Sequence, residues 1–260
     1  MKQRIVTAII ALAVLGGLLF FMPPIVVRVF IGLLLLAGAW EWSAFLSTGS
    51  LVTRLVYVAL IGILVLAMAT VLSAHTELVL KVSLAWWAVA LLWTFFFPTP
   101  IPEPVRWLAG ALVLVPLYSA LMLLYAADPS ILLFALLIVW VADSGAYAAG
   151  RTLGRVKLAP QISPGKTWEG VIGGLLAVVL LIALRSLKVE TNFAVLVPFC
   201  LGVAALSVVG DLTVSMFKRT SGLKDSGTMF PGHGGVLDRI DSVAAAAPLF
   251  ALGLSWAGVR

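Results

Sequence analysis

Charged residues, cysteine and histidine are all scarce in this sequence, and each scarcity excludes a class of protein. Only 11% of the 260 residues are charged while 62% are hydrophobic, and the mean hydropathy of +1.15 is far above that of soluble domains. A single cysteine, Cys200, excludes a disulfide framework and a cysteine metal cluster. The two histidines, His75 and His233, are too far apart in sequence to suggest a zinc site. The sequence therefore predicts an integral membrane protein whose chemistry takes place in or against the bilayer.

Long apolar runs, in contrast, are abundant, and they predict an all-α polytopic fold. A helix needs about twenty apolar residues to cross a bilayer. Breaks at proline, glycine and charged residues divide the chain into about nine expected transmembrane helices. These are residues 4–22, 25–46, 53–72, 78–97, 107–125, 130–148, 170–186, 193–213 and 240–258. The first resembles a secretory signal, but no cleavage pattern follows it, and we expect it to be a retained span.

Two polar loops, residues 150–169 and 214–239, interrupt the apolar pattern. We therefore divide the chain into N-terminal membrane helices, residues 1–130, and a C-terminal part, residues 131–260, in which the two loops form the catalytic region. Lysine and arginine are retained preferentially on the cytoplasmic side of a membrane. With a cytoplasmic N-terminus, most of the basic residues, including those of both loops, lie in the cytoplasm. This orientation places the C-terminus outside and explains the net charge of +6 without nucleic acid.

Four aspartates near the cytoplasmic ends of expected spans are the first candidates for chemistry. Asp143 and Asp211 each lie in an otherwise apolar span, where an ionised carboxylate costs about 2.5 to 3.5 kcal/mol. Asp238 and Asp241 are three residues apart and share one face of the last helix. A single aspartate of this kind can equally be a helix-end residue that reaches water. Four together favour a Mg2+ site, since this ion prefers carboxylate and phosphate oxygens.

Two further polar features each have a functional and a plain explanation. Glu41 lies within an expected span and either supports the site or reaches the membrane interface. Gly165-Lys166-Thr167 is not part of a P-loop, because the first glycine of that motif would fall at Pro160 and no strand is expected before it. Backbone amides and Lys166 are suited to hold phosphate, whereas the retention of positive charge in the cytoplasm explains the same lysine.

The segment from Ser215 to Asp241 carries the most specific pattern in the chain. It reads S-x2-K-R-x4-K-D-x-G-x2-F-P-x-H-G-G-x2-D-R-x-D. With these residues the sequence resembles the phosphatidate cytidylyltransferases, also called CDP-diacylglycerol synthases. A second region, from Asp143 to Thr167, is similar to the same family, so the resemblance covers the C-terminal half. The N-terminal half matches only in general character, apart from the Glu41-Trp42 pair.

The resemblance implies a reaction in which the phosphate of phosphatidate attacks the α-phosphorus of CTP and expels pyrophosphate. The difficulty is to bring one anion to another, and the remedy is cationic: Mg2+ between phosphates, with lysine and arginine beside the leaving group. The expected ligands of Mg2+ are Asp211, Asp238, Asp241 and Asp143, and a second cation in the site is left open. The expected catalytic residues are Asp211, Asp238, Lys218, Arg219, Lys224, His233 and Arg239. The expected phosphate-binding residues are Lys166, Ser163, Ser215, Gly234 and Gly235. Of two roles open to His233, we favour hydrogen-bond donor to phosphate over proton shuttle.

Other functions fit parts of the pattern. An ion-coupled transporter also places carboxylates in helices, but it does not require a glycine-rich basic segment. A CTP-dependent polyprenol kinase would use a similar apparatus and transfer the terminal phosphate instead. CDP-alcohol phosphotransferases have a D-x2-D-G-x2-A-R pattern that this sequence lacks. For the favoured function we expect CTP, phosphatidate and the lipid bilayer as partners, no nucleic acid, and a site at the cytoplasmic face of the inner membrane. A homodimer is left open.

Overall fold

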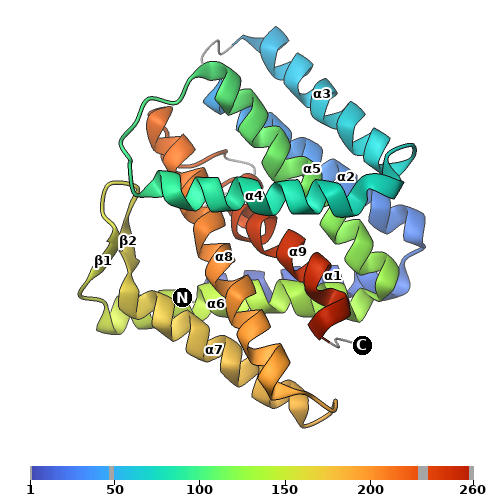
Figure 1. Cartoon of the computed structure of the whole chain (residues 1–260), viewed down its shortest axis with the longest axis vertical. Coiled ribbons are helices and arrows are strands. Elements are labelled where there is room, and N and C mark those ends of the chain that lie inside the picture. Colours follow the sequence, from blue (N-terminus) through green and yellow to red (C-terminus); the bar gives the residue numbers. More distant parts are fainter. Residues whose placement is uncertain (1, 47–49, 228–233, 258–260) are drawn as a thin grey trace.

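A computed structural model of the chain describes residues 2–46, 50–227 and 234–257, and these form nine α-helices and one β-hairpin (Figure 1). The helices are α1 (Lys2–Phe21), α2 (Pro24–Trp42), α3 (Leu51–Ala69), α4 (Thr76–Thr94), α5 (Glu103–Ala127), α6 (Pro129–Leu153), α7 (Trp168–Ser186), α8 (Phe193–Thr220) and α9 (Leu237–Ala257). Seven of them, α2 to α8, are long and apolar enough to cross a membrane. The prediction of an all-α polytopic membrane protein is confirmed, and each expected span corresponds to one helix.

Local sequence signals set several helix boundaries. Side chains that accept a backbone N–H of the first turn begin four of the helices. They are Ser50 for α3, Asp128 for α6, Thr167 for α7 and Asn192 for α8. At the end of α8, Gly222 has a φ of 70°, and the amides of Gly222 and Leu223 donate to Arg219 and Lys218. This left-handed glycine cap follows the end of the helix at Thr220, two residues after Lys218.

Both predicted polar loops are shorter than expected. α6 continues to Leu153, α8 continues to Thr220, and α9 already begins at Leu237. In α8 the buried side chains of Val214, Met216 and Phe217 extend the apolar face beyond the predicted end of the span. Two basic residues in its last turn also suit the negative end of the helix dipole. The predicted boundary at residue 214 is therefore wrong, and several predicted site residues lie on a rigid helix.

The first polar loop also contains a short antiparallel hairpin, β1 (Lys157–Ala159) and β2 (Ser163–Thr167). The expectation that no strand precedes Gly165-Lys166-Thr167 is therefore wrong, although Pro160 still excludes the P-loop pattern. The hairpin continues directly into α7, since the amide of Trp168 donates to Val156 at 2.9 Å. It holds β2 at the end of the α6–α7 pair (Figure 1).

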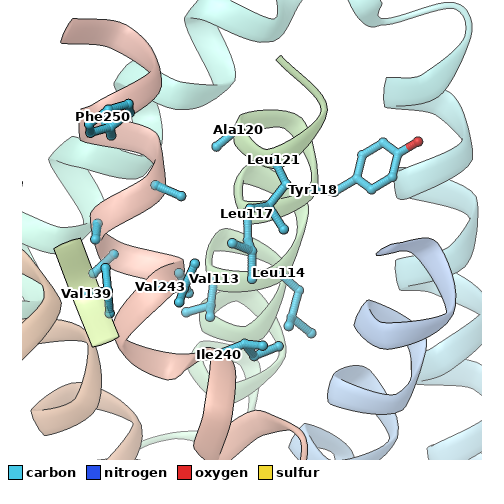
Figure 2. Packing of buried hydrophobic residues seen from close by; sticks show 14 of the residues in the cluster. Val113, Leu114, Leu117, Tyr118, Ala120, Leu121, Val139, Ile240, Val243 and Phe250 are labelled. Atoms are coloured by element: carbon cyan, nitrogen blue, oxygen red, sulfur yellow. The ribbon is translucent and has the colours of Figure 1, made fainter. Parts of the chain in front are cut away.

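The core is centred on α5 and α9. Figure 2 shows Val113 and Leu117 of α5 beside Val243 of α9, and Ile240 near Leu114. Most of α5 is buried although it is one of the longest helices, so other helices surround it. α9 packs against α8, α5 and α4, while α6 packs mainly against α7. The start of α9, which carries two of the predicted aspartates, is therefore fixed from several sides.

Candidate active site

The polar ends of several helices meet at one end of the bundle. The indole Nε1 of Trp42, the last residue of α2, donates to the carbonyl of Arg106 near the start of α5 at 2.9 Å. The Trp42 ring also lies 5.1 Å from the ring of Phe217 in the last turns of α8. The ion pair of Lys218 with Asp238 links the end of α8 to the start of α9. Antiparallel alternation of the helices thus gathers distant polar residues, as the predicted topology requires.

Lys166 and Asp211 form the first of two ion pairs in the site. The Lys166 Nζ of β2 lies 2.6 Å from an Asp211 carboxylate oxygen of α8, and the two side chains are 24% and 31% exposed. The Ser215 hydroxyl, one helical turn further along α8, donates to the other Asp211 oxygen at 3.1 Å. The hairpin therefore brings an ammonium group to a carboxylate that lies on a helix.

Lys218 and Asp238 form the second ion pair, and it is more deeply buried. Their charged atoms are 2.6 Å apart, and the side chains are only 10% and 13% exposed. The second oxygen of Asp238 accepts the backbone N–H groups of Ser226 at 3.1 Å and Gly235 at 3.0 Å. Burial alone would raise the pKa of Asp238, but these hydrogen bonds and the Lys218 charge hold the pKa below its usual range. Asp238 is thus a fixed carboxylate at the start of α9, ahead of the apolar part of that helix.

Asp143 and Asp241 lie close enough to Asp211 to interact with it electrostatically. Asp241 is 5% exposed, whereas Asp143 is exposed and shares a hydrogen bond with the hydroxyl of Ser242. Gly210 brings Asp211 to this position, because its Cα lies against the backbone of Asp241 and a side chain there would overlap α9. The carboxylates of α6, α8 and α9 therefore face one region, in which lysines supply the balancing charge.

The donor set around Asp211 fits Mg2+, but not as a complete cage of protein ligands. Carboxylate oxygen is the hard donor that Mg2+ requires, and the ion usually keeps one or two protein carboxylates together with phosphates and water. No group of three or more histidine, cysteine, aspartate or glutamate side chains has metal-site geometry within the part of the chain that the structure describes. The Mg2+ site therefore stays a prediction, in which substrate phosphates and water would complete the shell of the ion.

The remaining predicted residues lie around these two pairs. Arg219 is exposed and its Nε donates to the carbonyl of Ile162 at 3.1 Å, which joins the end of α8 to the hairpin. Lys224 and Arg239 are also exposed, and Ser163 is half-buried at the start of β2. Gly234 has a φ of 78°, a left-handed conformation that favours glycine. His233 belongs to residues 228–233, which lie outside the described residues.

Two residues of the site were not predicted from the sequence. Ser226 donates its amide to Asp238, and Ser242 forms a hydrogen bond with Asp143. Both are small polar residues beside residues of the recognised pattern: Ser226 follows Asp225, and Ser242 follows Asp241. Their position next to residues of the pattern was the available sequence signal that they belong to the site. Their partners lie 12 and 99 residues away along the chain, so the contacts themselves had no local signature.

The sequence of the chain is similar to those of known cytidylyltransferases. The family model described as the cytidylyltransferase family matches residues 2–256. A phosphatidate cytidylyltransferase of Pseudomonas aeruginosa is 40% identical over 266 residues, covering 99% of this chain and 97% of that protein. One of Haemophilus influenzae is 37% identical over 279 residues, covering 96% and 97%. One of Staphylococcus saprophyticus is 45% identical over 120 residues, covering 45% and 46%. Because the family model matches nearly the whole length of the chain, the chain belongs to the cytidylyltransferase family.

Proposed function

We propose that the chain is a phosphatidate cytidylyltransferase, which transfers the cytidylyl group of CTP to phosphatidate and yields CDP-diacylglycerol and pyrophosphate. The observation that carries the proposal is the pair of Lys–Asp contacts, Lys166–Asp211 and Lys218–Asp238, at one polar end of a membrane-helix bundle. Relatives of that name share 37% and 40% identity along nearly the whole chain. The site therefore has charges of both signs where a lipid phosphate and a nucleotide must meet.

The reaction exchanges one phosphoanhydride bond for another. An oxygen of the phosphatidate phosphate forms a bond to the α-phosphorus of CTP, and the bond from that phosphorus to the β-phosphate oxygen breaks. Pyrophosphate leaves with the bonding electrons. A phosphate monoester with a second pKa of about 6 is already mostly dianionic near neutral pH, so no strong base is required. The task of the protein is to hold and neutralise anions.

The two lysines are suited to this task because each ammonium group already contacts an anionic oxygen, that of an aspartate. In the proposed enzyme, the ammonium groups of Lys166 and Lys218 contact substrate phosphates in place of, or in addition to, Asp211 and Asp238. Mg2+ bound through Asp211 would supply the further positive charge that offsets repulsion between the two substrates. Asp241 and Asp143, which lie beside Asp211, are proposed to support that ion. Arg219, Lys224 and Arg239 are proposed to hold the outer phosphates.

The chain is a multi-pass membrane protein, and we propose that its active site faces the cytoplasm at the inner membrane. CTP is supplied from the cytosol, while the phosphatidate head group lies at the bilayer surface. The basic residues of the hairpin and of the α8–α9 connection favour retention on the cytoplasmic side. A site at the polar helix ends is then open to both substrates. The sequence leaves a homodimer open, and the mass of the detergent-solubilised particle would test it.

The proposed function is tested with the purified protein in detergent, supplied with CTP, phosphatidate and Mg2+. We expect pyrophosphate and CDP-diacylglycerol in equal amounts. Chelation of Mg2+ by EDTA should stop the reaction, and added Mg2+ should restore it. Release of CDP together with a phosphorylated lipid would instead identify a CTP-dependent lipid kinase. No turnover with any phosphatidate tested, from protein that is folded and binds CTP, would contradict the proposal.

A further inference from the structure

Glu41 is a carboxylate buried at the end of α2, where only 4% of its surface is exposed. One oxygen accepts the backbone N–H of Val236 at 3.0 Å. The other accepts the N–H of Leu237 at 2.7 Å and the hydroxyl of Ser226 at 3.1 Å. None of the ion pairs among the described residues includes Glu41. Its hydrogen-bond partners are thus neutral groups of two segments that are about 190 residues away in sequence.

These contacts place Glu41 at the start of another helix. α9 begins at Leu237, and the first N–H groups of a helix have no acceptor within that helix. They also form the positive end of the helix dipole, which a carboxylate stabilises. Hydrogen bonds from N–H to a charged oxygen are stronger than neutral ones, and burial strengthens them further. α2 therefore supplies the N-terminal cap of α9 through Glu41.

Two glycines of the pattern pack directly against this carboxylate. A methyl group at Gly227 or at Gly235 would overlap the Glu41 side chain. The two segments that contain these glycines therefore both pack against the Glu41 carboxylate. The presence of glycine at both positions thus has a packing explanation in addition to the predicted phosphate contact of Gly235.

The same two segments also hold Asp238. Ser226 gives its hydroxyl to Glu41 and its amide to Asp238, and Gly235, beside Val236, gives its amide to Asp238 as well. Lys218 holds the other oxygen of Asp238. A displacement of these segments would therefore move Asp238 relative to Lys218.

We infer that Glu41 is a positioning residue, which holds Ser226 and the start of α9 so that Asp238 and Lys218 keep their relative placement. The inference rests on the proposed function, in which Asp238 and Lys218 serve the cytidylyl transfer. Glu41 acts through these two residues and is not assigned to substrate. Its effect is consequently expected on the rate of the chemical step more than on the binding of CTP.

The kinetic test compares Glu41→Gln and Glu41→Ala with the matched control Glu77→Gln in the full-length protein. Glutamine keeps the size and one acceptor oxygen of Glu41, whereas alanine removes both. Glu77 is exposed on α4 in an ion pair with Lys81, so it reports the loss of a carboxylate elsewhere. We expect kcat to fall about tenfold in Glu41→Gln and further in Glu41→Ala, with KM for CTP changed less than about twofold. Glu77→Gln should retain the original kcat.

A second measurement, amide hydrogen exchange without substrate, separates positioning from general loss of folding. We expect faster exchange in the peptide of residues 234–245 in both Glu41 variants, with the other helices protected as before. Faster exchange in all helices, with kcat per folded molecule unchanged, would overturn the inference, as would the original kcat in Glu41→Ala. If Glu41→Ala does not fold, the kcat and the amide exchange of Glu41→Gln decide whether the inference holds. If the unmodified protein makes no CDP-lipid, the proposed function fails, while exchange still decides whether Glu41 holds α9.

Discussion

At the scale of single residues, the site consists of carboxylates that are each tied to a defined donor. Asp211 pairs with Lys166 and accepts a hydrogen bond from Ser215. Asp238 pairs with Lys218 and accepts hydrogen bonds from two backbone amides. The two ion pairs differ in burial, and this difference separates their energetic roles. Loss of one partner from a buried pair leaves an uncompensated charge, but a partly exposed pair can recruit water. The same type of substitution should therefore have different consequences at the two pairs.

Asp238→Asn should impair both turnover and folding. The substitution leaves the Lys218 ammonium, which is 10% exposed, without its anionic partner, and removal of one member of a buried pair costs about 3 to 5 kcal/mol. We expect a clearly lowered melting temperature in detergent. The double variant Lys218→Met with Asp238→Leu should recover much of the stability but none of the activity. A melting temperature of the single variant equal to that of the unmodified protein would show that the pair is not needed for folding.

Lys166→Ala should impair catalysis with little effect on stability. Lys166 lies on the hairpin and its pair with Asp211 is about a quarter exposed, so folding depends on it less. We expect kcat/KM for CTP to fall about 100-fold, the size of effect seen when one donor to a developing charge is removed. Lys157→Ala, an exposed lysine of the same hairpin, is the matched control. Equal kcat/KM in the two variants would mean that Lys166 only helps to retain its loop in the cytoplasm.

At the scale of secondary-structure elements, close contact between helices brings the carboxylates together. Gly210 allows α8 to approach the backbone of α9 at Asp241. A similar contact joins α6 to α7, where Gly174 lies against the carbonyl of Ala142, next to Asp143. Small residues at such crossings are typical of helix packing in membranes. Gly210 therefore determines how close Asp211 of α8 lies to Asp241 of α9, and Gly174 allows α7 to approach α6 beside Asp143.

Gly210→Ala should separate α8 from α9. The added methyl would overlap the Asp241 carbonyl and approach Ala245, and overpacking of this kind costs about 1 to 3 kcal/mol. We expect a lower melting temperature and lower kcat, because Asp211 moves relative to Asp241. Gly202→Ala on the same helix is the control, since its methyl would meet only Leu249 at 3.9 Å. Similar stability and kcat in the two variants would mean that the close contact of α8 with α9 does not determine the placement of Asp211 relative to Asp241.

The elements were largely predictable from the sequence, whereas their contacts were not. Apolar length predicted every helix, and the i, i+3 spacing of Asp238 and Asp241 predicted that they share a face of the last helix, α9. The end of α8 was missed because the predicted span stopped at residue 213, whereas the buried side chains of the helix continue to Lys218. The Lys166–Asp211 pair depends on how the hairpin folds onto α8, and the Glu41 contacts join residues about 190 positions apart. Local patterns contain no information on such pairings.

At the scale of the whole molecule, all polar helix ends of the site lie on one side of the bundle. α2 and α8 end there, and α5 and α9 begin there. The hairpin adds Lys166 to the same end. The account therefore requires that this end face the cytoplasm, where CTP is available. The α7–α8 connection, with Glu190, should lie on the opposite side of the membrane.

Orientation can be measured with introduced cysteines and a maleimide that does not cross membranes. Gly165→Cys in the hairpin and Glu190→Cys between α7 and α8 are both at exposed positions, and Cys200 is buried. In intact spheroplasts we expect labelling of Glu190→Cys alone. Labelling of Gly165→Cys should require permeabilised membranes. The reverse pattern would place the site outside and contradict the proposed access of CTP.

The most direct test of the central claim follows which phosphate of CTP reaches the lipid. The purified protein is supplied with phosphatidate, Mg2+ and CTP labelled with phosphorus-32 at either the α- or the γ-position. The account predicts that the α-label enters the lipid product and that the γ-label leaves in pyrophosphate, with Asp211→Asn transferring neither. Entry of the γ-label into the lipid, with the α-label left in CDP, would contradict the account and identify a kinase.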